Sequence, residues 1–223
     1  MTYETPEYHP AFEEYCETIF ELAEDEVDVI QARIAERLEV SRPAVSEMVR
    51  RMEKESLVVV DDGFISLTAA GLQLAKQVVR RHRLAECFLT EILGLPWAEA
   101  HHEAGKWEHI ISGPVEDAMM RVLDDPTTCP HGNPIPGAGY KAPERSAVLS
   151  DLTPGIEFTV ERIPEELEFR DGLLEFLEGA EVKPGNRGRV TASSPDGTTT
   201  IEIAGEFVGV GSFASARILV ALD

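Results

Sequence analysis

The chain has 223 residues, of which 43% are hydrophobic and 27% charged, and its formal net charge is −21 at pH 7. This length allows one large domain or two to three small ones, and the composition is ordinary for a soluble globular protein. No stretch of about 18 apolar residues occurs, and the first residues lack a basic region followed by an apolar one, so we expect neither a membrane span nor a signal peptide.

The cysteines indicate the compartment. There are three, Cys16, Cys87 and Cys129, and no CxxC pair occurs. An odd number at wide spacing argues against a disulfide framework or a zinc knuckle. We therefore expect a protein of the reducing cytoplasm.

The net charge taken alone argues against nucleic-acid binding, because a DNA-binding surface is basic. The charge is unevenly distributed, however: residues 29–60 contain six basic and five acidic side chains. The acidity therefore lies mostly elsewhere, and divalent cations could offset part of it.

The first part of the chain predicts three helices and a hairpin. Apolar residues recur at helical spacing over 11–24, and a second helix fits 29–38. Ser41 is a suitable N-cap and Pro43 suits the first turn of a third helix that runs to about Glu55. Two β-rich runs flank Asp61-Asp62-Gly63, as in a tight hairpin. This order predicts a winged helix-turn-helix.

The next part predicts a helical domain. A long helix fits 68–93, and two more fit 97–111 and 114–123. Their broad apolar faces suggest a dimer interface, and its candidates are Leu84, Phe88, Leu89, Ile92, Trp107, Met119 and Met120. The stretch 126–154 is rich in Pro, Gly, Asn and Ser, which is typical of a connector.

The last part predicts a small β-barrel of five short strands, interrupted by a helical piece at 173–177. The expected strands are 158–161, 188–191, 199–203, 206–208 and 216–220. The fold class is thus α+β. We expect a DNA-binding domain over 1–72, a helical dimerisation and metal-binding domain over 73–140, a linker over 141–152 and a barrel domain over 153–223.

Glutamate and histidine side chains recur three or four residues apart on three of the expected helices, so that each helix presents a polar stripe. They are Glu14 and Glu17 on the first helix, His82 and Glu86 on the long helix, and His101, Glu108 and His109, with Gly105 between them, on the next. Imidazole and carboxylate suit Mn, Fe, Co, Ni or Zn. Because the carboxylates repel one another without a cation, a divalent ion would tie three helices together and could act as a switch.

The spacing alone leaves an ordinary interpretation equally open. A lone histidine on a helix is usually a core or surface residue, and His9, His102 and His131 fit that description. A His–Glu pair four residues apart is commonly a solvated contact. Cys16 fits a small packed hydrophobe better than a ligand.

Four segments in this order give the chain a resemblance to the DtxR family of metal-dependent repressors, which includes iron-dependent and manganese transport regulators. They are residues 32–38 (ARIAERL), 81–86 (RHRLAE), 103–109 and 132–137 (GNPIPG). The resemblance is close over about residues 12–137. It implies a winged helix-turn-helix, a helical dimerisation domain and often an SH3-like (FeoA-like) domain.

The resemblance also implies two metal sites. His82, Glu86 and His101 match an ancillary site, which in iron-type members is completed from the SH3-like domain; here Glu168 and Asp171 are the candidates.

The primary site of iron-type members uses a Met and a Cys where this chain has Glu14 and Gly105, and Glu108 and His109 are retained. Manganese regulators have two acidic residues spaced like Glu14 and Glu17, and a Glu at the place of Gly105. The site therefore departs from both patterns, although Gly105 can still offer a carbonyl oxygen. Loss of sulfur leaves oxygen and imidazole, so we expect Mn(II), with Fe(II) as a second activator.

In a helix-turn-helix, the second helix enters the major groove, and its N-terminal residues meet the bases. The candidates for DNA contact are Ser41, Arg42, Pro43, Ser46 and Glu47, with Arg33, Arg50 and Arg51 for the backbone. Relatives have Gln at the position of Glu47; a Glu there could accept from cytosine N4 or face solvent. The arginines could equally be solvated helix charges.

The leading hypothesis is a manganese-dependent homodimeric repressor of metal-uptake genes that binds palindromic operators. An iron-specific repressor and a winged-helix regulator that works without metal stay open. A metalloenzyme has little support, because no HExxH, P-loop, dinucleotide fingerprint or nucleophile-plus-base motif occurs.

Overall fold

The computed structural model describes residues 10–222. The expectations for the N-terminal leader and for His9 lie outside the described residues. The described chain divides into two compact units, one that extends to His82 and includes Lys106–Ile111, and one formed by Arg83–Gly105 and the chain from Ser112 onward. Within the described part, no helix combines the length and apolar character that a membrane span requires.

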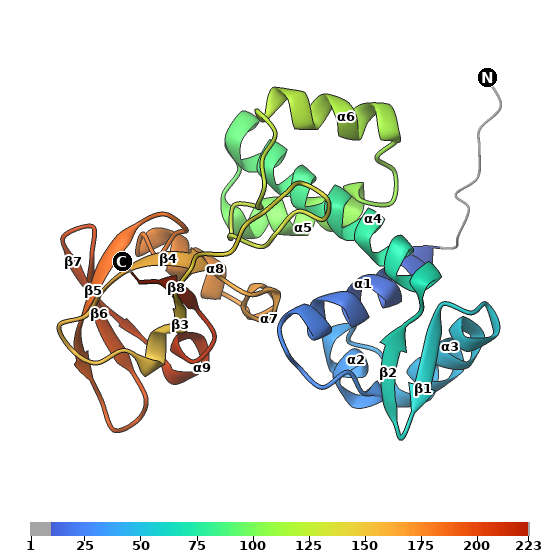
Figure 1. Ribbon diagram of the computed structural model, residues 1–223, viewed down its shortest axis with the longest axis horizontal. Helices are drawn as coiled ribbons and strands as arrows, with labels where there is room; N and C mark the ends of the chain where they lie inside the picture. Colours follow the sequence, from blue (N-terminus) through green and yellow to red (C-terminus); the bar gives the residue numbers. More distant parts are fainter. Residues whose placement is uncertain (1–9, 223) are drawn as a thin grey trace. The chain divides into compact units, whose positions relative to one another are not determined.

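The first unit contains the expected winged helix-turn-helix (Figure 1). Its helices are α1 (Pro10–Glu24), α2 (Gln31–Arg37), α3 (Arg42–Lys54) and the first part of α4 (Ala69–Cys87). Strands β1 (Val58–Asp61) and β2 (Phe64–Leu67) pair antiparallel. A buried core that includes Cys16, Ile34 and Met52 joins these elements, so the interpretation of Cys16 as a packed hydrophobe is confirmed.

Local signals explain the boundaries in this unit. Ser41 Oγ accepts a hydrogen bond from the Ala44 backbone N–H at 3.3 Å, which caps α3 as expected. Asp62 and Gly63 both have positive φ, 47° and 84°, as the tight turn of a hairpin requires. A Cβ at Gly71 would stand 2.0 Å from the Leu57 carbonyl oxygen, so α4 can pass close to the start of the wing only because this residue is glycine.

The second unit starts with the rest of α4. The π-helical turn η1 (Phe88–Ile92), α5 (Trp97–Trp107) and α6 (Gly113–Val122) follow. The expected helix 97–111 therefore ends early: Glu108 and His109 lie in a turn after α5, shortly before Gly113-Pro114 starts α6. Gly113 and Pro114 are the first residues of α6, a position at which proline is well tolerated.

The C-terminal part is a six-stranded antiparallel sheet in the order β3-β8-β4-β5-β6-β7 (Figure 1). Its strands are β3 (Ser146–Val148), β4 (Glu157–Arg162), β5 (Arg187–Ser193), β6 (Thr199–Ile203), β7 (Glu206–Val210) and β8 (Leu219–Ala221). Short helices α7 (Glu165–Glu168), α8 (Leu173–Gly179) and α9 (Ser212–Ser215), and the 3-10 turn η2 (Leu149–Asp151), connect them.

Two expectations for this part were wrong. The last strand was expected over 216–220, but residues 216–218 follow α9 outside any strand, and β8 begins at Leu219. Strand β3 and η2 lie inside the expected connector and linker. A three-residue strand carries too little alternation to be recognised in the sequence, and β3 exists because it pairs with β8.

Candidate metal centre

The first unit brings together three buried side chains from distant parts of the sequence. They are Glu17 on α1, His82 on α4 and Glu108 in the turn after α5, and their ligand atoms lie within 4.8 Å of one another. His82 Nδ1 is 2.5 Å from Glu108 Oε2. The group thus joins three segments through side chains that all suit a divalent cation.

In this first cluster, burial and neighbouring negative charges disfavour the ionised form of Glu17. Burial raises the pKa of Glu17 well above its ordinary value, and the charges of Glu108 and Glu21 add to the effect. Glu17 Oε1 is buried without a hydrogen-bond partner among the described residues. A cation beside these carboxylates would supply that missing interaction and lower their mutual repulsion.

His109 lies beside the first cluster in a defined orientation. Its Nδ1 is 2.6 Å from Glu13 Oε2, and its Nε2 is 3.2 Å from Glu108 Oε1. Hydrogen bonds with Glu13 and Glu14 raise the pKa of His109 to about 10. A carboxylate on one ring nitrogen leaves the other for a metal ion, which is the usual arrangement of a metal-binding histidine. Glu14 is more exposed, and its Oε1 is 3.8 Å from His109 Nε2.

A second cluster lies wholly in the second unit. Its members are Glu86 on α4, His101 on α5, Cys129 and His131 on the loop before β3, and Glu165 and Glu168 on α7. Two separate sets have ligand atoms within 4.8 Å of one another, Glu86 with Cys129 and His131, and His101 with Glu165 and Glu168.

Short contacts connect the members of the second cluster. Glu168 Oε2 is 2.9 Å from His131 Nδ1 and 3.0 Å from His101 Nδ1. Glu86 Oε1 is 2.9 Å from His101 Nδ1. Cys129 Sγ is 3.9 Å from His131 Nδ1. The cluster therefore offers oxygen, nitrogen and sulfur within one buried volume.

The charges of the second cluster compensate one another. Burial opposes a charge on His131, but the carboxylates of Glu168 and Glu86 hold its pKa well above the ordinary value. Burial likewise opposes a charge on Glu168, and the His131 imidazolium nevertheless helps to lower its pKa to about 2. Burial raises the pKa of Cys129 to about 12, so its thiol is protonated at neutral pH until a metal displaces the proton.

Both clusters fit a divalent cation by their donor chemistry. In the first, Glu17, His82, Glu108 and His109 would hold it through oxygen and nitrogen. In the second, the buried His131 Nε2 has no hydrogen-bond partner among the described residues, as expected for a histidine near a metal site. A bound ion would supply positive charge that neutralises the carboxylates and links the segments that carry them.

The structure adds residues that the sequence did not suggest. Glu13 is four residues before Glu17 on the same helix face, a spacing that could have identified it. Cys129 and His131 lie two residues apart in the segment that composition assigned to a connector, and His131 was assigned to an ordinary position. The sequence could not indicate that they lie beside Glu86, because the loop has no periodic pattern.

Three of the expected residues do not join either cluster. Glu14 and Asp171 are exposed and belong to no group of ligand atoms among the described residues. Gly105 has open space around it: a Cβ there would meet no atom within 4 Å.

The candidate DNA-contacting residues lie on the surface of α2 and α3. Arg33, Arg42, Pro43, Glu47 and Arg50 are exposed, and Ser46 is half-buried. Arg33 also pairs with Glu36 at 3.0 Å, and the Arg51 guanidinium stacks over Phe12 at 5.3 Å from the ring centre. Arg51 therefore has a contact of its own within the first unit.

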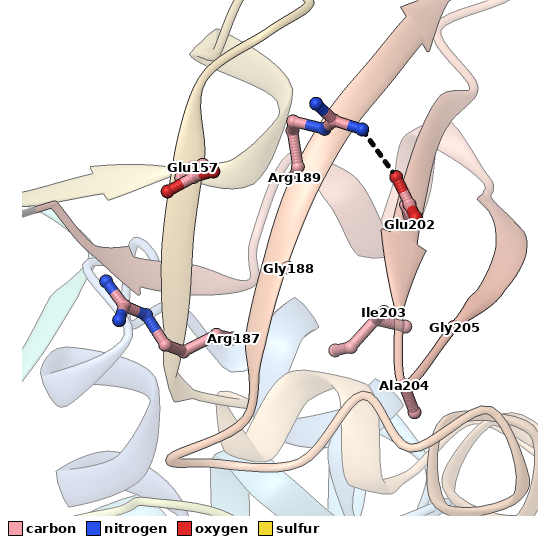
Figure 2. A pocket seen from close by; sticks show the side chains of 8 residues that line it. All are labelled: Glu157, Arg187, Gly188, Arg189, Glu202, Ile203, Ala204 and Gly205. Atoms are coloured by element: carbon pink, nitrogen blue, oxygen red, sulfur yellow. Dashed lines mark hydrogen bonds and ion pairs between the residues drawn. The ribbon is translucent and has the colours of Figure 1, made fainter.

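A pocket on the C-terminal sheet has no comparable chemistry. Figure 2 shows charged side chains of both signs on neighbouring strands there, with Arg189 paired to Glu202 at 2.7 Å. Glu157 and Glu202 both face Arg189 in the strand register. Alternating charges on an exposed sheet face are typical of a solvated surface.

Two family models match the chain. The iron dependent repressor N-terminal DNA binding domain matches residues 8–62, and the iron dependent repressor metal binding and dimerisation domain matches residues 68–137.

Individual relatives agree with these matches. The iron-dependent repressor IdeR of Mycobacterium tuberculosis is 42% identical over 204 residues, covering 86% of this chain and 88% of the relative. The diphtheria toxin repressor of Corynebacterium diphtheriae is 51% identical over 126 residues, covering 56% of each chain. The solved structure of a manganese-dependent transcriptional repressor in complex with manganese is similar with a TM-score of 0.82 at 32% identity, over 95% of this chain and 100% of the other. The chain therefore belongs to the DtxR family: it is a metal-dependent transcriptional repressor, and not an enzyme, with a DNA-binding domain and a domain for metal binding and dimerisation.

Proposed function

We propose that this repressor is activated by Mn(II), with Fe(II) as a second activator, and that it represses metal-uptake genes when the metal is bound. The observation that carries the proposal is the first cluster, in which Glu17, His82 and Glu108 are buried together and offer only oxygen and nitrogen. Such donors suit the harder Mn(II). Divalent ions later in the first transition row bind a given site more tightly, so the amount of each metal available in the cell also sets which one is bound.

We propose His109 as a further ligand of the first cluster, held by Glu13, and Glu14 as a residue at its edge. Gly105 contributes at most its backbone carbonyl. In the second cluster we propose Glu86, His101, Cys129, His131 and Glu168 as ligands, and we drop Asp171 because it is exposed.

An iron-specific repressor is the second candidate. Cys129 Sγ belongs to the second cluster, and a sulfur donor favours softer ions than Mn(II). A relative with 42% identity is named an iron-dependent repressor, whereas the solved structure with a TM-score of 0.82 is named for manganese. The metal preference thus depends on which cluster controls DNA binding.

The proposed switch works through the first cluster. Glu17 lies on α1, which packs in the core of the winged helix-turn-helix, whereas His82 lies on α4. Without a cation, burial and like charges disfavour the ionised carboxylates, and segments that carry them gain by moving apart. Metal binding therefore favours the arrangement in which these segments meet, and we propose that this is the arrangement that binds DNA.

We propose that two copies bind a palindromic operator in the cytoplasm, with α3 in the major groove. Ser41, Arg42, Pro43, Ser46 and Glu47 are the proposed groove residues, and Arg33, Arg50 and Arg51 the proposed phosphate contacts. The proposed domain division is 1–72 for DNA binding, 73–140 for dimerisation and metal binding, 141–152 as linker and 153–223 as the C-terminal domain.

Operator binding in a gel-shift assay with Mn(II), Fe(II) or a chelator tests the proposal. We expect Mn(II) to raise the affinity by at least about 10-fold, an ordinary coupling between sites, and His82→Ala to abolish that gain. His102→Ala, at an exposed histidine on α5, is the matched control and should respond as the wild type does. Equal affinity with metal and with chelator would contradict the proposal and favour a metal-independent regulator.

The same assay separates the two candidate metals. If Cys129→Ser leaves the Mn(II) response intact, the first cluster controls DNA binding. If only Fe(II) activates, and Cys129→Ser removes that activation, the iron-specific alternative holds.

A further inference from the structure

Asn133 is a fully buried polar side chain next to the second cluster. Its Nδ2 donates to Glu168 Oε1 at 2.7 Å and to the Ile163 carbonyl oxygen at 3.0 Å. Its Oδ1 accepts from Arg162 Nε at 2.5 Å. Two acceptors on one side and a donor on the other fix the orientation of the amide, since the flipped amide would oppose like groups at all three contacts.

Because of the contact with Asn133, the two carboxylate oxygens of Glu168 have different partners. Oε1 accepts from Asn133, whereas Oε2 faces His131 Nδ1 at 2.9 Å and His101 Nδ1 at 3.0 Å. A carboxylate on a short helix such as α7 could otherwise rotate about its side-chain torsions. The amide therefore selects which oxygen is presented to the second cluster.

The backbone on either side of Asn133 is attached to the same segment. Ile163 N–H donates to the His131 carbonyl oxygen at 2.8 Å. Gly132 has φ +87°, and a Cβ there would stand 2.1 Å from the Glu161 carbonyl oxygen. The loop that carries Cys129 and His131 is thus held against the end of β4, immediately before the helix that carries Glu168.

We infer that Asn133 is a positioning residue of the second metal site: it orients Glu168 so that Oε2 is available to a divalent cation, and it joins the loop of Cys129 and His131 to the C-terminal domain. The inference rests on the proposed function only in taking the second cluster as a metal site. Partners of this kind typically contribute 10- to 100-fold to metal affinity.

Asn133→Asp is the sharpest test because it preserves shape and the contact with Arg162 but removes the donor to Glu168. Asn133→Leu removes all three polar contacts at similar volume. The measurement is a cobalt(II) titration of the full chain, followed through the thiolate-to-cobalt charge-transfer band of Cys129, with total bound cobalt from equilibrium dialysis. We expect both variants to weaken the site that gives this band by about 10- to 100-fold, and to leave cobalt binding without the band unchanged.

Asn186→Asp is the matched control. Asn186 also donates to a glutamate, Glu181 Oε2 at 3.4 Å, but on an exposed turn of the same unit. It should leave the band and its midpoint as in the wild type. Cobalt binding without the band distinguishes positioning from a general structural role, since a structural role would weaken both classes of cobalt site together. Thermal unfolding of the metal-free variants measures any loss of stability.

An unchanged midpoint of the cobalt titration in Asn133→Asp would overturn the inference. A charge-transfer band that persists in the Cys129→Ser variant would also overturn it. Operator binding is not measured in this experiment. If Mn(II) fails to promote operator binding while the Asn133 variants lose the second site, the proposed activation by Mn(II) fails and the inference stands.

Discussion

Glu17 illustrates how one residue can report on a metal site. A carboxylate of ordinary exposure on a helix would stay ionised, but burial and the neighbouring carboxylates raise the pKa of this one well above its ordinary value. The side chain is thus poorly satisfied by the protein alone, and that is the condition under which a cation binds favourably.

Glu17→Gln should therefore separate stability from metal binding. The amide is neutral and keeps the shape, so the metal-free protein should be as stable as the wild type or more stable by about 1 kcal/mol. Loss of the carboxylate should weaken Mn(II) binding at the first cluster by at least about 100-fold, the upper end of the effect of outer partners. Thermal melting and calorimetric Mn(II) titration measure the two effects. Glu99→Gln, at an exposed position on α5, should change neither.

His109 gives a pH dependence with a defined sign. Its pKa is raised to about 10 by hydrogen bonds with Glu13 and Glu14, so at neutral pH it carries a proton in the metal-free protein. Binding of a metal ion to Nε2 displaces that proton, and Mn(II) affinity at the first cluster should increase with pH up to about 10. A titration series that shows no such increase would argue against His109 as a ligand.

The same shift affects the stability of the metal-free protein in the opposite direction. A raised pKa stabilises the folded state fully below the unfolded value of about 6.5, and this contribution is lost as pH rises through about 10. Glu13→Gln should lower the pKa of His109, measured by NMR titration of the imidazole, and shift the loss of stability to lower pH.

At the scale of elements, the loop between α6 and β3 is the segment whose role changed most. Its composition is that of a connector, yet it contributes Cys129 and His131 to the second cluster. An isolated bridge between Thr128 and Pro134 and the contacts of Gly132 hold it in place. Its position therefore depends on the close approach of Gly132 to β4 and on the hydrogen bond between Ile163 and His131.

Gly132→Ala tests this approach. Gly132 has both a positive φ and a carbonyl oxygen 2.1 Å from the position of a Cβ, whereas Gly139 has a positive φ and no atom within 4 Å. Alanine at Gly139 should cost about 1–2 kcal/mol of stability for backbone strain alone. Alanine at Gly132 should cost more and should remove the cobalt band of Cys129. Equal effects of the two variants in urea unfolding and cobalt titration would show that the loop does not need the close approach.

At the scale of the whole molecule, the net charge of −21 and the two acidic clusters make stability sensitive to divalent cations. Ions that bind the folded state only stabilise it by mass action, by about 2.7 kcal/mol per site at 100 times the dissociation constant. Addition of Mn(II) should therefore raise the melting temperature, and a chelator should reverse the rise. Mg(II) at the same ionic strength is the control for screening, and an equal rise with Mg(II) would contradict specific binding.

Much of the fold could be predicted because it depends on local signals. The N-cap Ser41, the Asp62-Gly63 turn and the apolar periodicity of α1, α3 and α4 act within a few residues, and the elements they predict are present. Strand β3 and the end of α5 were not predicted. The first depends on a partner strand far along the chain, and the second places Glu108 and His109 in a turn.

The sequence by itself determined the family and the α+β fold, because helical and strand periodicity are local signals, but it assigned His82 to a different site from Glu17 and Glu108. Only the tertiary structure decided that Glu13 holds His109, that Cys129 and His131 meet Glu86, and that Glu168 rather than Asp171 lies beside His101. The physical reason is that a loop residue has no periodicity to indicate its face. Its neighbours are set by backbone contacts such as those of Gly132 and Ile163, which join segments about 30 residues apart in the sequence and which the local sequence does not encode.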